Sequence, residues 1–172
     1  MRSFITRRDF SIMRRANNWP APRWIQTCAI GATRAGDGWL WCAAGLAVLV
    51  FGGEERIAAL ASAGLAAVLS ALLFLLTKRF TGRRRPCEIE PHCWATLLPP
   101  DQFSFPSGHT MTAFAVAVPL SMFYPAVAVG LLFCALSIAT SRILLGMHFL
   151  SDVIAGALIG TVLGYLGYFA FA

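Results

Sequence analysis

Residues 141 to 152 have the sequence Ser141-Arg142-Ile143-Leu144-Leu145-Gly146-Met147-His148-Phe149-Leu150-Ser151-Asp152. The chain on either side is apolar enough to lie in a lipid bilayer, where ionisable side chains are costly and commonly mark a functional site. His148 and Asp152 are four residues apart, so in a helix they share one face and the carboxylate can orient the imidazole ring. The segment therefore predicts either a histidine that acts as a nucleophile or base, or merely the polar cap of a helix that begins near residue 152.

The composition indicates that most of this chain lies in lipid. Hydrophobic residues make up 58% of the 172 residues and charged residues only 13%, which is too apolar for a soluble domain of this length. A soluble or nucleic-acid-binding protein is therefore disfavoured, and the net charge of +6 is better explained by membrane topology. Because the first 24 residues lack the apolar core of a cleavable signal peptide, the first membrane span is expected to direct insertion.

Apolar runs predict an all-α fold, a polytopic membrane helix bundle with about five transmembrane helices. The runs cover about residues 39–53, 57–77, 110–123, 126–140 and 153–172, and the first is short for the roughly 20 residues that a span needs. Residues 1–36 form a separate basic segment, either an interfacial helix on anionic lipid head groups or a disordered tail. Residues 37–172 form the membrane-embedded domain, in which Gly156, Gly160 and Gly164 are assigned to close helix packing.

The order of the spans places three polar clusters at one face of the membrane. The second helix ends in the loop of residues 78–105, the third helix starts from that loop, and the fourth helix returns to the same side just before Ser141. The first cluster is the basic run from Lys78 to Arg85, which alone is typical of an orientation signal. In the second, Pro106-Ser107-Gly108-His109, a sharp turn leaves backbone N–H groups free at a helix N-terminus, which is a ready site for an anion.

Together these clusters resemble one family, the type 2 phosphatidic acid phosphatases, which share a superfamily with the vanadium-dependent haloperoxidases. The family pattern is K-x6-R-P, then P-S-G-H, then S-R-x5-H-x3-D. This chain matches every spacing, with Lys78 and Arg85-Pro86, Pro106-Ser107-Gly108-His109, and Ser141-Arg142, His148 and Asp152.

The resemblance implies a role for each matched residue. His148 would attack phosphorus to form a phosphohistidine, Asp152 would orient His148, and His109 would protonate the leaving oxygen. The phosphoryl oxygens would be held by Lys78, Arg85, Ser107, Gly108 and Arg142. The reaction would need no metal or cofactor, and the sequence has no cluster of carboxylates and histidines with the spacing of a two-metal phosphatase.

Several residues near the motifs leave alternatives open. Arg79, Arg83 and Arg84 either hold a second phosphate or are solvated residues that set orientation. Cys87 and Cys93 either form a disulfide, which favours an oxidising exterior, or remain thiols. The excess of Lys and Arg on the side of the active site favours the cytoplasm, whereas a disulfide would favour the exterior. The side of the membrane that the site faces therefore stays open.

The expected function is that of a lipid phosphatase in the cytoplasmic membrane of a bacterium. Its partner would be a phosphorylated lipid, with polyprenyl or undecaprenyl diphosphate as the first choice, and no nucleic acid. A phosphatase for soluble phosphate esters and a catalytically silent protein that binds lipid phosphates are the alternatives. A transporter is disfavoured because the chain shows neither an internal repeat nor broken helices at mid-membrane. The sequence does not determine the oligomeric state.

Overall fold

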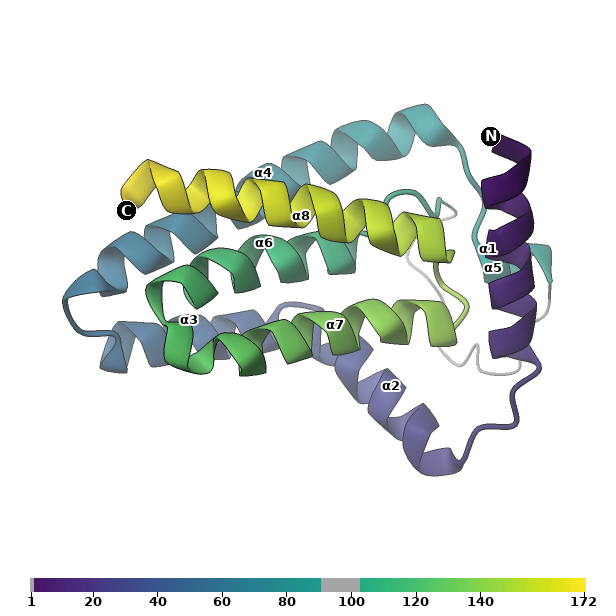
Figure 1. The fold of residues 1–172 in the computed structure, drawn as a ribbon, viewed down its shortest axis with the longest axis horizontal. Helices are drawn as coiled ribbons and strands as arrows, with labels where there is room; N and C mark the ends of the chain where they lie inside the picture. The colour runs from purple at the N-terminus through teal and green to yellow at the C-terminus, as the bar shows by residue number, and fades with distance from the viewer. Residues whose placement is uncertain (1, 91–102) are drawn as a thin grey trace.

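The computed structural model describes residues 2–90 and 103–172, and within these ranges the regular structure is helical. Figure 1 shows the arrangement. The α-helices are α1 (Arg2–Asn17), α2 (Arg23–Ala35), α3 (Trp39–Phe51), α4 (Arg56–Thr81), α5 (Pro86–Ile89), α6 (Gly108–Phe123), α7 (Ala128–Leu144) and α8 (Leu150–Phe171). Two short 3-10 helices, η1 (Gly53–Glu55) and η2 (Pro125–Val127), complete the connections at the far end of the bundle.

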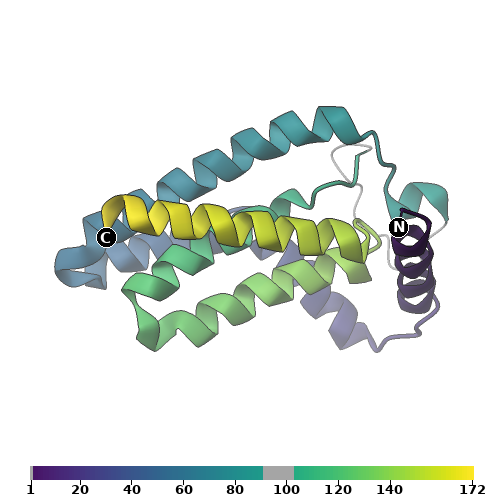
Figure 2. The same ribbon diagram turned by 45° about the horizontal axis from the view of Figure 1, so that its top comes forward.

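Helices α3, α4, α6, α7 and α8 run alternately in opposite directions and form the bundle (Figures 1 and 2). Helix α6 lies at its centre, in contact with α4, α7 and α8. Three segments are long and apolar enough to cross a membrane, Gly53–Lys78, Pro125–Leu144 and Leu150–Phe171, whereas Trp39–Phe51 and Gly108–Phe123 are shorter apolar helices. The predicted all-α membrane bundle is confirmed, and the count of five full spans stays a prediction.

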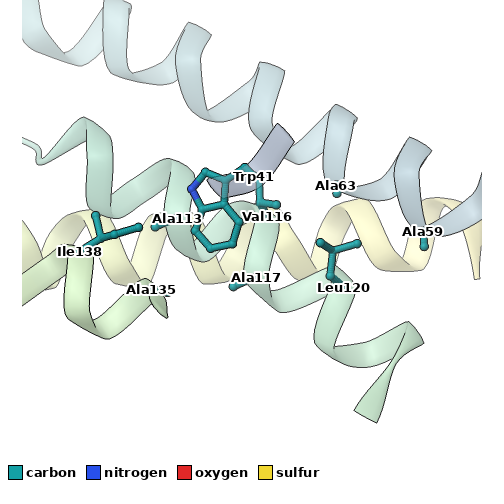
Figure 3. Packing of buried hydrophobic residues seen from close by; sticks show 9 residues of the cluster. All are labelled: Trp41, Ala59, Ala63, Ala113, Val116, Ala117, Leu120, Ala135 and Ile138. Carbon is teal, nitrogen blue, oxygen red and sulfur yellow. The ribbon is translucent and has the colours of Figure 1, made fainter. Parts of the chain in front are cut away.

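The core between α3, α4, α6 and α7 is built largely from alanine side chains. Figure 3 shows its buried members, which are Trp41, Ala59, Ala63, Ala113, Val116, Ala117, Leu120, Ala135 and Ile138. Small side chains let helix backbones approach closely, which favours packing where lipid removes the hydrophobic driving force between helices. The many buried residues of α6 are consistent with its central position, because the surrounding helices shield it from lipid.

The glycines of the last helix pack against α6, as the four-residue spacing predicts. Gly156, Gly160 and Gly164 are all buried. A Cβ atom on Gly156 would lie 2.7 Å from the Ser107 carbonyl oxygen, and one on Gly164 would lie 2.8 Å from the Val118 side chain. Since real Cβ atoms do not approach so closely, the stripe fixes how near α8 lies to α6.

The N-terminal segment forms two helices, separated where Trp19-Pro20-Ala21-Pro22 predicts a break. Helix α1 lies across the end of the bundle at which α7 ends and α8 begins (Figures 1 and 2). It buries Asp9 and Met13 and places the Phe10 ring 5.4 Å from that of Phe149. Its arginines at positions 7, 8, 14 and 15 are exposed. The contact of this face with anionic lipid and the domain boundary at residue 36 stay predictions.

Candidate active site

A cleft of about 360 Å³ lies at the end of the bundle where α4 ends and α6 begins. It brings together residues from all three polar clusters and from the turn between α2 and α3. The lining consists of Gly36, Asp37, Gly38, Ala71, Phe74, Arg85, Gly108, His109, Thr112, Arg142 and His148. The predicted convergence of the clusters is therefore present in the structure, and both histidines and two of the three predicted cations line one cleft.

His148 is buried in the turn between α7 and α8. Its Nδ1 atom lies 2.5 Å from the carbonyl oxygen of Ser104, which can only accept, so Nδ1 carries the proton. Nε2 is then unprotonated and accepts a hydrogen bond of 3.0 Å from Arg85 Nη1, which also donates to the Met147 carbonyl oxygen. This tautomer presents a nitrogen lone pair next to the guanidinium group of Arg85, in the cleft.

The surroundings of His148 favour the neutral imidazole. Burial, followed by the positive charges of Arg142 and Arg85, lowers the pKa of His148 well below its ordinary value of 6.5. A nitrogen that attacks phosphorus must be unprotonated. Near neutral pH, His148 is therefore in the form that a nucleophile requires.

Asp152 does not make the direct hydrogen bond that the four-residue spacing predicts. Its Oδ2 atom lies 3.9 Å from His148 Nδ1 and instead accepts a hydrogen bond of 2.9 Å from the Phe149 N–H group. The carboxylate thus caps the first turn of α8, and this cap is compatible with a catalytic role for His148. It supports the turn that carries His148, while the carbonyl oxygen of Ser104 holds the ring itself.

His109 lies in the first turn of α6, beside Gly108, and both line the cleft. The Nε2 atom of His109 lies 2.7 Å from Oδ1 of Asp37, in the turn between α2 and α3. The sequence Gly36-Asp37-Gly38 predicts a turn but indicates no role for Asp37. Asp37 is separated from His109 by 72 residues, so no local pattern connects the two.

Ser107 and Lys78, which are predicted to hold phosphate, lie beside the cleft. Neither is among the described residues that line it. The hydroxyl group of Ser107 is buried and 2.9 Å from Thr110 Oγ1, and its N–H group donates to the Asp152 carbonyl oxygen at 3.1 Å. The turn motif predicts that this N–H group is free to bind an anion. In the structure it is instead occupied by the hydrogen bond to Asp152. The Nζ atom of Lys78 lies 5.5 Å from the centre of the Phe74 ring, and Phe74 belongs to the cleft wall.

Arg83 has a structural environment that neither sequence alternative anticipates. Its guanidinium group pairs with Asp152 Oδ1 at 2.6 Å and with Asp9 Oδ2 at 2.7 Å, and it covers the Phe149 ring at 4.2 Å. Asp9 in turn accepts hydrogen bonds from the N–H and hydroxyl groups of Ser151. Arg83 is thus neither a solvated surface residue nor part of the cleft wall, because it ties α1 to the start of α8.

The remaining arginines of the basic run and the two cysteines of the loop lie away from the cleft lining or outside the described residues. Arg84 is exposed, whereas the side chain of Arg79 lies outside the described residues. Cys93 also lies outside them, so both alternatives for Cys87 and Cys93, a disulfide or free thiols, stay open. Among the described side chains there is no group of three or more potential metal ligands.

Comparison with known proteins places this cleft in a family. The sequence model of the PAP2 superfamily matches residues 57–171. The chain belongs to the PAP2 superfamily. The match contains all three motifs of the cleft and confirms the resemblance to type 2 phosphatidic acid phosphatases. The PAP2 match begins after the turn that carries Asp37, so this turn lies outside it.

Curated relatives of this PAP2 chain include phosphatases of different lipids. The chain is 34% identical over 109 residues to a lipid A 1-phosphatase of Rhizobium johnstonii, covering 61% of this chain and 45% of the relative. It is also 34% identical over 105 residues to a decaprenylphosphoryl-5-phosphoribose phosphatase of Mycobacterium tuberculosis, covering 59% of this chain and 55% of the relative. The chain thus spans about half the length of the curated relatives it matches.

Two solved structures share the PAP2 architecture along nearly the whole chain. The crystal structure of Aquifex aeolicus LpxE superposes with a TM-score of 0.78 and 29% identity, covering 92% of this chain and 93% of the other. A transmembrane PAP2-type phosphatidylglycerolphosphate phosphatase of Bacillus subtilis superposes with a TM-score of 0.73 and 24% identity, covering 95% and 84%. The second likeness concerns the fold alone.

Proposed function

We propose that this PAP2 protein is an integral membrane lipid phosphatase that hydrolyses a phosphate monoester or a diphosphate through a phosphohistidine. The observation that carries the proposal is the cleft in which His148, held neutral, faces Arg85 and Arg142 with His109 alongside. Phosphoryl transfer depends mainly on positioning and on neutralising negative charge spread over the phosphoryl oxygens. The two arginines and the N-terminus of α6 provide both, and Lys78 is proposed to approach when substrate binds.

The proposed reaction has two steps. In the first, the lone pair of His148 Nε2 attacks phosphorus, the bond from phosphorus to the lipid oxygen breaks, and His109 gives that oxygen a proton. Arg85, which donates to Nε2 in this structure, would turn its N–H groups to the phosphoryl oxygens. In the second step, water attacks the phosphohistidine, His109 recovers a proton from the water, and His148 leaves as the neutral ring. Asp152 would keep the turn of His148 in place throughout.

The position of the cleft supports a lipid substrate. Ala71 of α4 lines the cleft and is itself exposed, and the neighbouring Leu72 and Leu75 are exposed on the same helix. This part of α4 belongs to a segment that can cross a membrane. A phosphorylated head group can therefore enter among the arginines while its hydrocarbon tail remains in lipid beside α4.

The relatives widen the choice of lipid. The sequence favours a polyprenyl or undecaprenyl diphosphate, whereas proteins similar to this chain are named for a phosphate of lipid A and for a decaprenyl-linked sugar phosphate. All of these substrates combine a terminal phosphate with a large apolar anchor. The proposal therefore extends to this class of lipid, in the cytoplasmic membrane of a bacterium. The alternatives are hydrolysis of soluble phosphate esters and binding of a lipid phosphate without catalysis.

The test is phosphate release by the detergent-purified protein in the presence of EDTA. The panel contains undecaprenyl diphosphate, lipid A 1-phosphate, phosphatidylglycerol phosphate, phosphatidic acid and a soluble phosphate ester, and the matched variant is His148→Ala. Release from a lipid by the wild type and none by His148→Ala is expected. Turnover of the soluble ester alone would favour the first alternative, and binding of a lipid phosphate without turnover would favour the second.

A further inference from the structure

The turn between α2 and α3 places a carboxylate against the histidine that is proposed to act as the acid. Asp37 Oδ1 lies 2.7 Å from His109 Nε2, with 50% of the Asp37 side chain and 26% of the His109 side chain exposed. Both residues line the cleft. A carboxylate is otherwise unfavourable at a site that has to bind a phosphate, so its presence beside His109 calls for a function.

The backbone of this turn is shaped for close contact with His109. A Cβ atom on Gly36 would lie 3.2 Å from His109 Cδ2 and 2.9 Å from the Ile138 side chain, so a larger residue would push the turn away from the ring. Gly38 has a φ angle of +119°, which residues other than glycine rarely adopt. The Asp37 N–H group is also fixed, because it donates to the Arg34 carbonyl oxygen at 3.1 Å. Asp37 is therefore presented to His109 by a constrained turn.

The charges around His109 explain why an acid at this position needs a carboxylate. Arg85 and Arg142 line the same cleft, and their positive charges oppose the protonated imidazole that a general acid requires. A negative charge in contact with the ring offsets this repulsion. It also selects the tautomer, because Nε2 must carry a proton to donate to Asp37.

We propose that Asp37 is a positioning residue for His109, an inference that rests on the proposed phosphatase function. The Asp37 carboxylate accepts a hydrogen bond from the Nε2–H group, so that Nδ1 exchanges a proton with the substrate. When the bond from phosphorus to the lipid oxygen breaks, that oxygen keeps the electron pair and takes the Nδ1 proton. When water attacks the phosphohistidine, a water proton passes to Nδ1 and restores the imidazolium.

The kinetic test compares two substrates that differ in their need for an acid. Dodecyl phosphate has a poor leaving group, whereas an aryl phosphate with the same alkyl tail and a nitro group on the ring leaves readily without protonation. General acid catalysis contributes about 10²–10⁴-fold, so Asp37→Asn is expected to lower kcat for dodecyl phosphate about tenfold or more. For the nitroaryl phosphate, kcat is expected to change less than about threefold, with a small change in KM in both cases.

Three further variants separate this role from a structural one. In a His109→Gln background, Asp37→Asn is expected to cause no further loss on dodecyl phosphate, and Asp37→Glu is expected to recover part of the activity. Glu54→Gln, which removes an exposed carboxylate at the opposite end of the bundle, should behave as the wild type. Equal losses on both substrates, or no loss on either, would overturn the proposal.

A second measurement does not depend on turnover. In protein labelled with nitrogen-15 histidine, the signals of His109, assigned with the His109→Gln variant, are expected to show Nε2 as a proton-bearing nitrogen. This preference should be lost in Asp37→Ala, which leaves no acceptor for Nε2–H. A wild-type ring that carries its proton on Nδ1 alone would overturn the proposal, whereas absence of phosphatase activity with the expected spectrum would count only against the proposed function.

Discussion

At the scale of single residues, the ring of His148 is fixed by groups from three separate segments. The carbonyl oxygen of Ser104 accepts from Nδ1, the guanidinium group of Arg85 donates to Nε2, and Asp152 fastens the turn by accepting the Phe149 N–H group. The carbonyl oxygen of Ser104 selects the tautomer, while the nearest Asp152 oxygen stays 3.9 Å from Nδ1, beyond hydrogen-bond contact with the ring. This combination is suited to a histidine that has to remain a neutral nucleophile.

The lowered pKa of His148 predicts a specific dependence of stability on pH. Below the ordinary pKa of about 6.5, the unfolded chain takes up a proton at this residue while the folded protein does not, so protonation favours unfolding. The free energy of unfolding should therefore decrease as the pH falls from 6.5, with a slope that approaches about 1.4 kcal/mol per pH unit for this one group. We expect the melting temperature of the wild type to fall more steeply between pH 6.5 and 5 than that of His148→Gln. Parallel curves for the two proteins would show that His148 protonates normally in the fold.

At the scale of elements, the pairing of α6 with α8 sets the geometry of the cleft. Helix α6 carries Gly108 and His109 at its N-terminus, and α8 starts immediately after the turn that holds His148. The two helices are held close by the buried glycines of α8. The separation of the two histidines consequently depends on contacts well inside the bundle.

The variant Gly160→Ala tests this dependence. A Cβ atom at residue 160 would overlap the Met111 carbonyl oxygen, so α6 and α8 must move apart, and overpacking of this kind costs about 1–3 kcal/mol. We expect a lower melting temperature and reduced phosphate release. The matched control is Gly64→Ala in α4, where a Cβ atom meets nothing within 4 Å and alanine favours the helix. If Gly160→Ala melted and turned over substrate as Gly64→Ala does, the close packing would not control the site.

At the scale of the whole molecule, α1 is joined to the end of the bundle that holds the cleft by a chain of charged groups. Asp9 of α1 pairs with Arg83, which follows α4, and Arg83 pairs with Asp152 of α8. Asp9 is 3% exposed, so this connection is largely shielded from solvent. The N-terminal segment is therefore part of the support for the turn that carries His148, in addition to its exposed arginine face.

Asp9→Asn should release α1 from the bundle. The change leaves a guanidinium group and the Ser151 donors facing a neutral amide, and loss of a charged partner at a buried hydrogen-bonded site costs about 1–3 kcal/mol. We expect faster trypsin cleavage at Arg14 or Arg15, both exposed, together with a lower melting temperature. The exposed Ser11 supplies a control on the same helix as Ser11→Ala. Unchanged cleavage in Asp9→Asn would mean that the other contacts of α1, such as those of Phe10 with Phe149 and of Arg14 with Glu90, hold it without the Asp9 ion pair.

The residue pattern is enough to predict the helical membrane bundle and the meeting of His148, His109, Arg85 and Arg142 in one cleft. Apolar runs define the helices because backbone polar groups in lipid must be satisfied within a segment. Because neighbouring helices are antiparallel, the three motifs meet at one end of the bundle. This can be predicted without knowing how the side chains pack. The cap that Asp152 forms can also be predicted from the sequence, since it depends on residues one helical turn apart.

The partners of the two proposed catalytic histidines, and of the arginine that ties α1 to α8, follow only from the folded structure. Ser104 contacts His148 across 44 residues, Asp37 contacts His109 across 72 and Asp9 contacts Arg83 across 74. Two of these partners are carboxylates in segments without a recognisable motif, and the third is a backbone carbonyl group, which every residue possesses. Hydrogen bonds of this kind depend on the path of the backbone to within a fraction of an ångström, so the fold, and not the residue pattern, selects them.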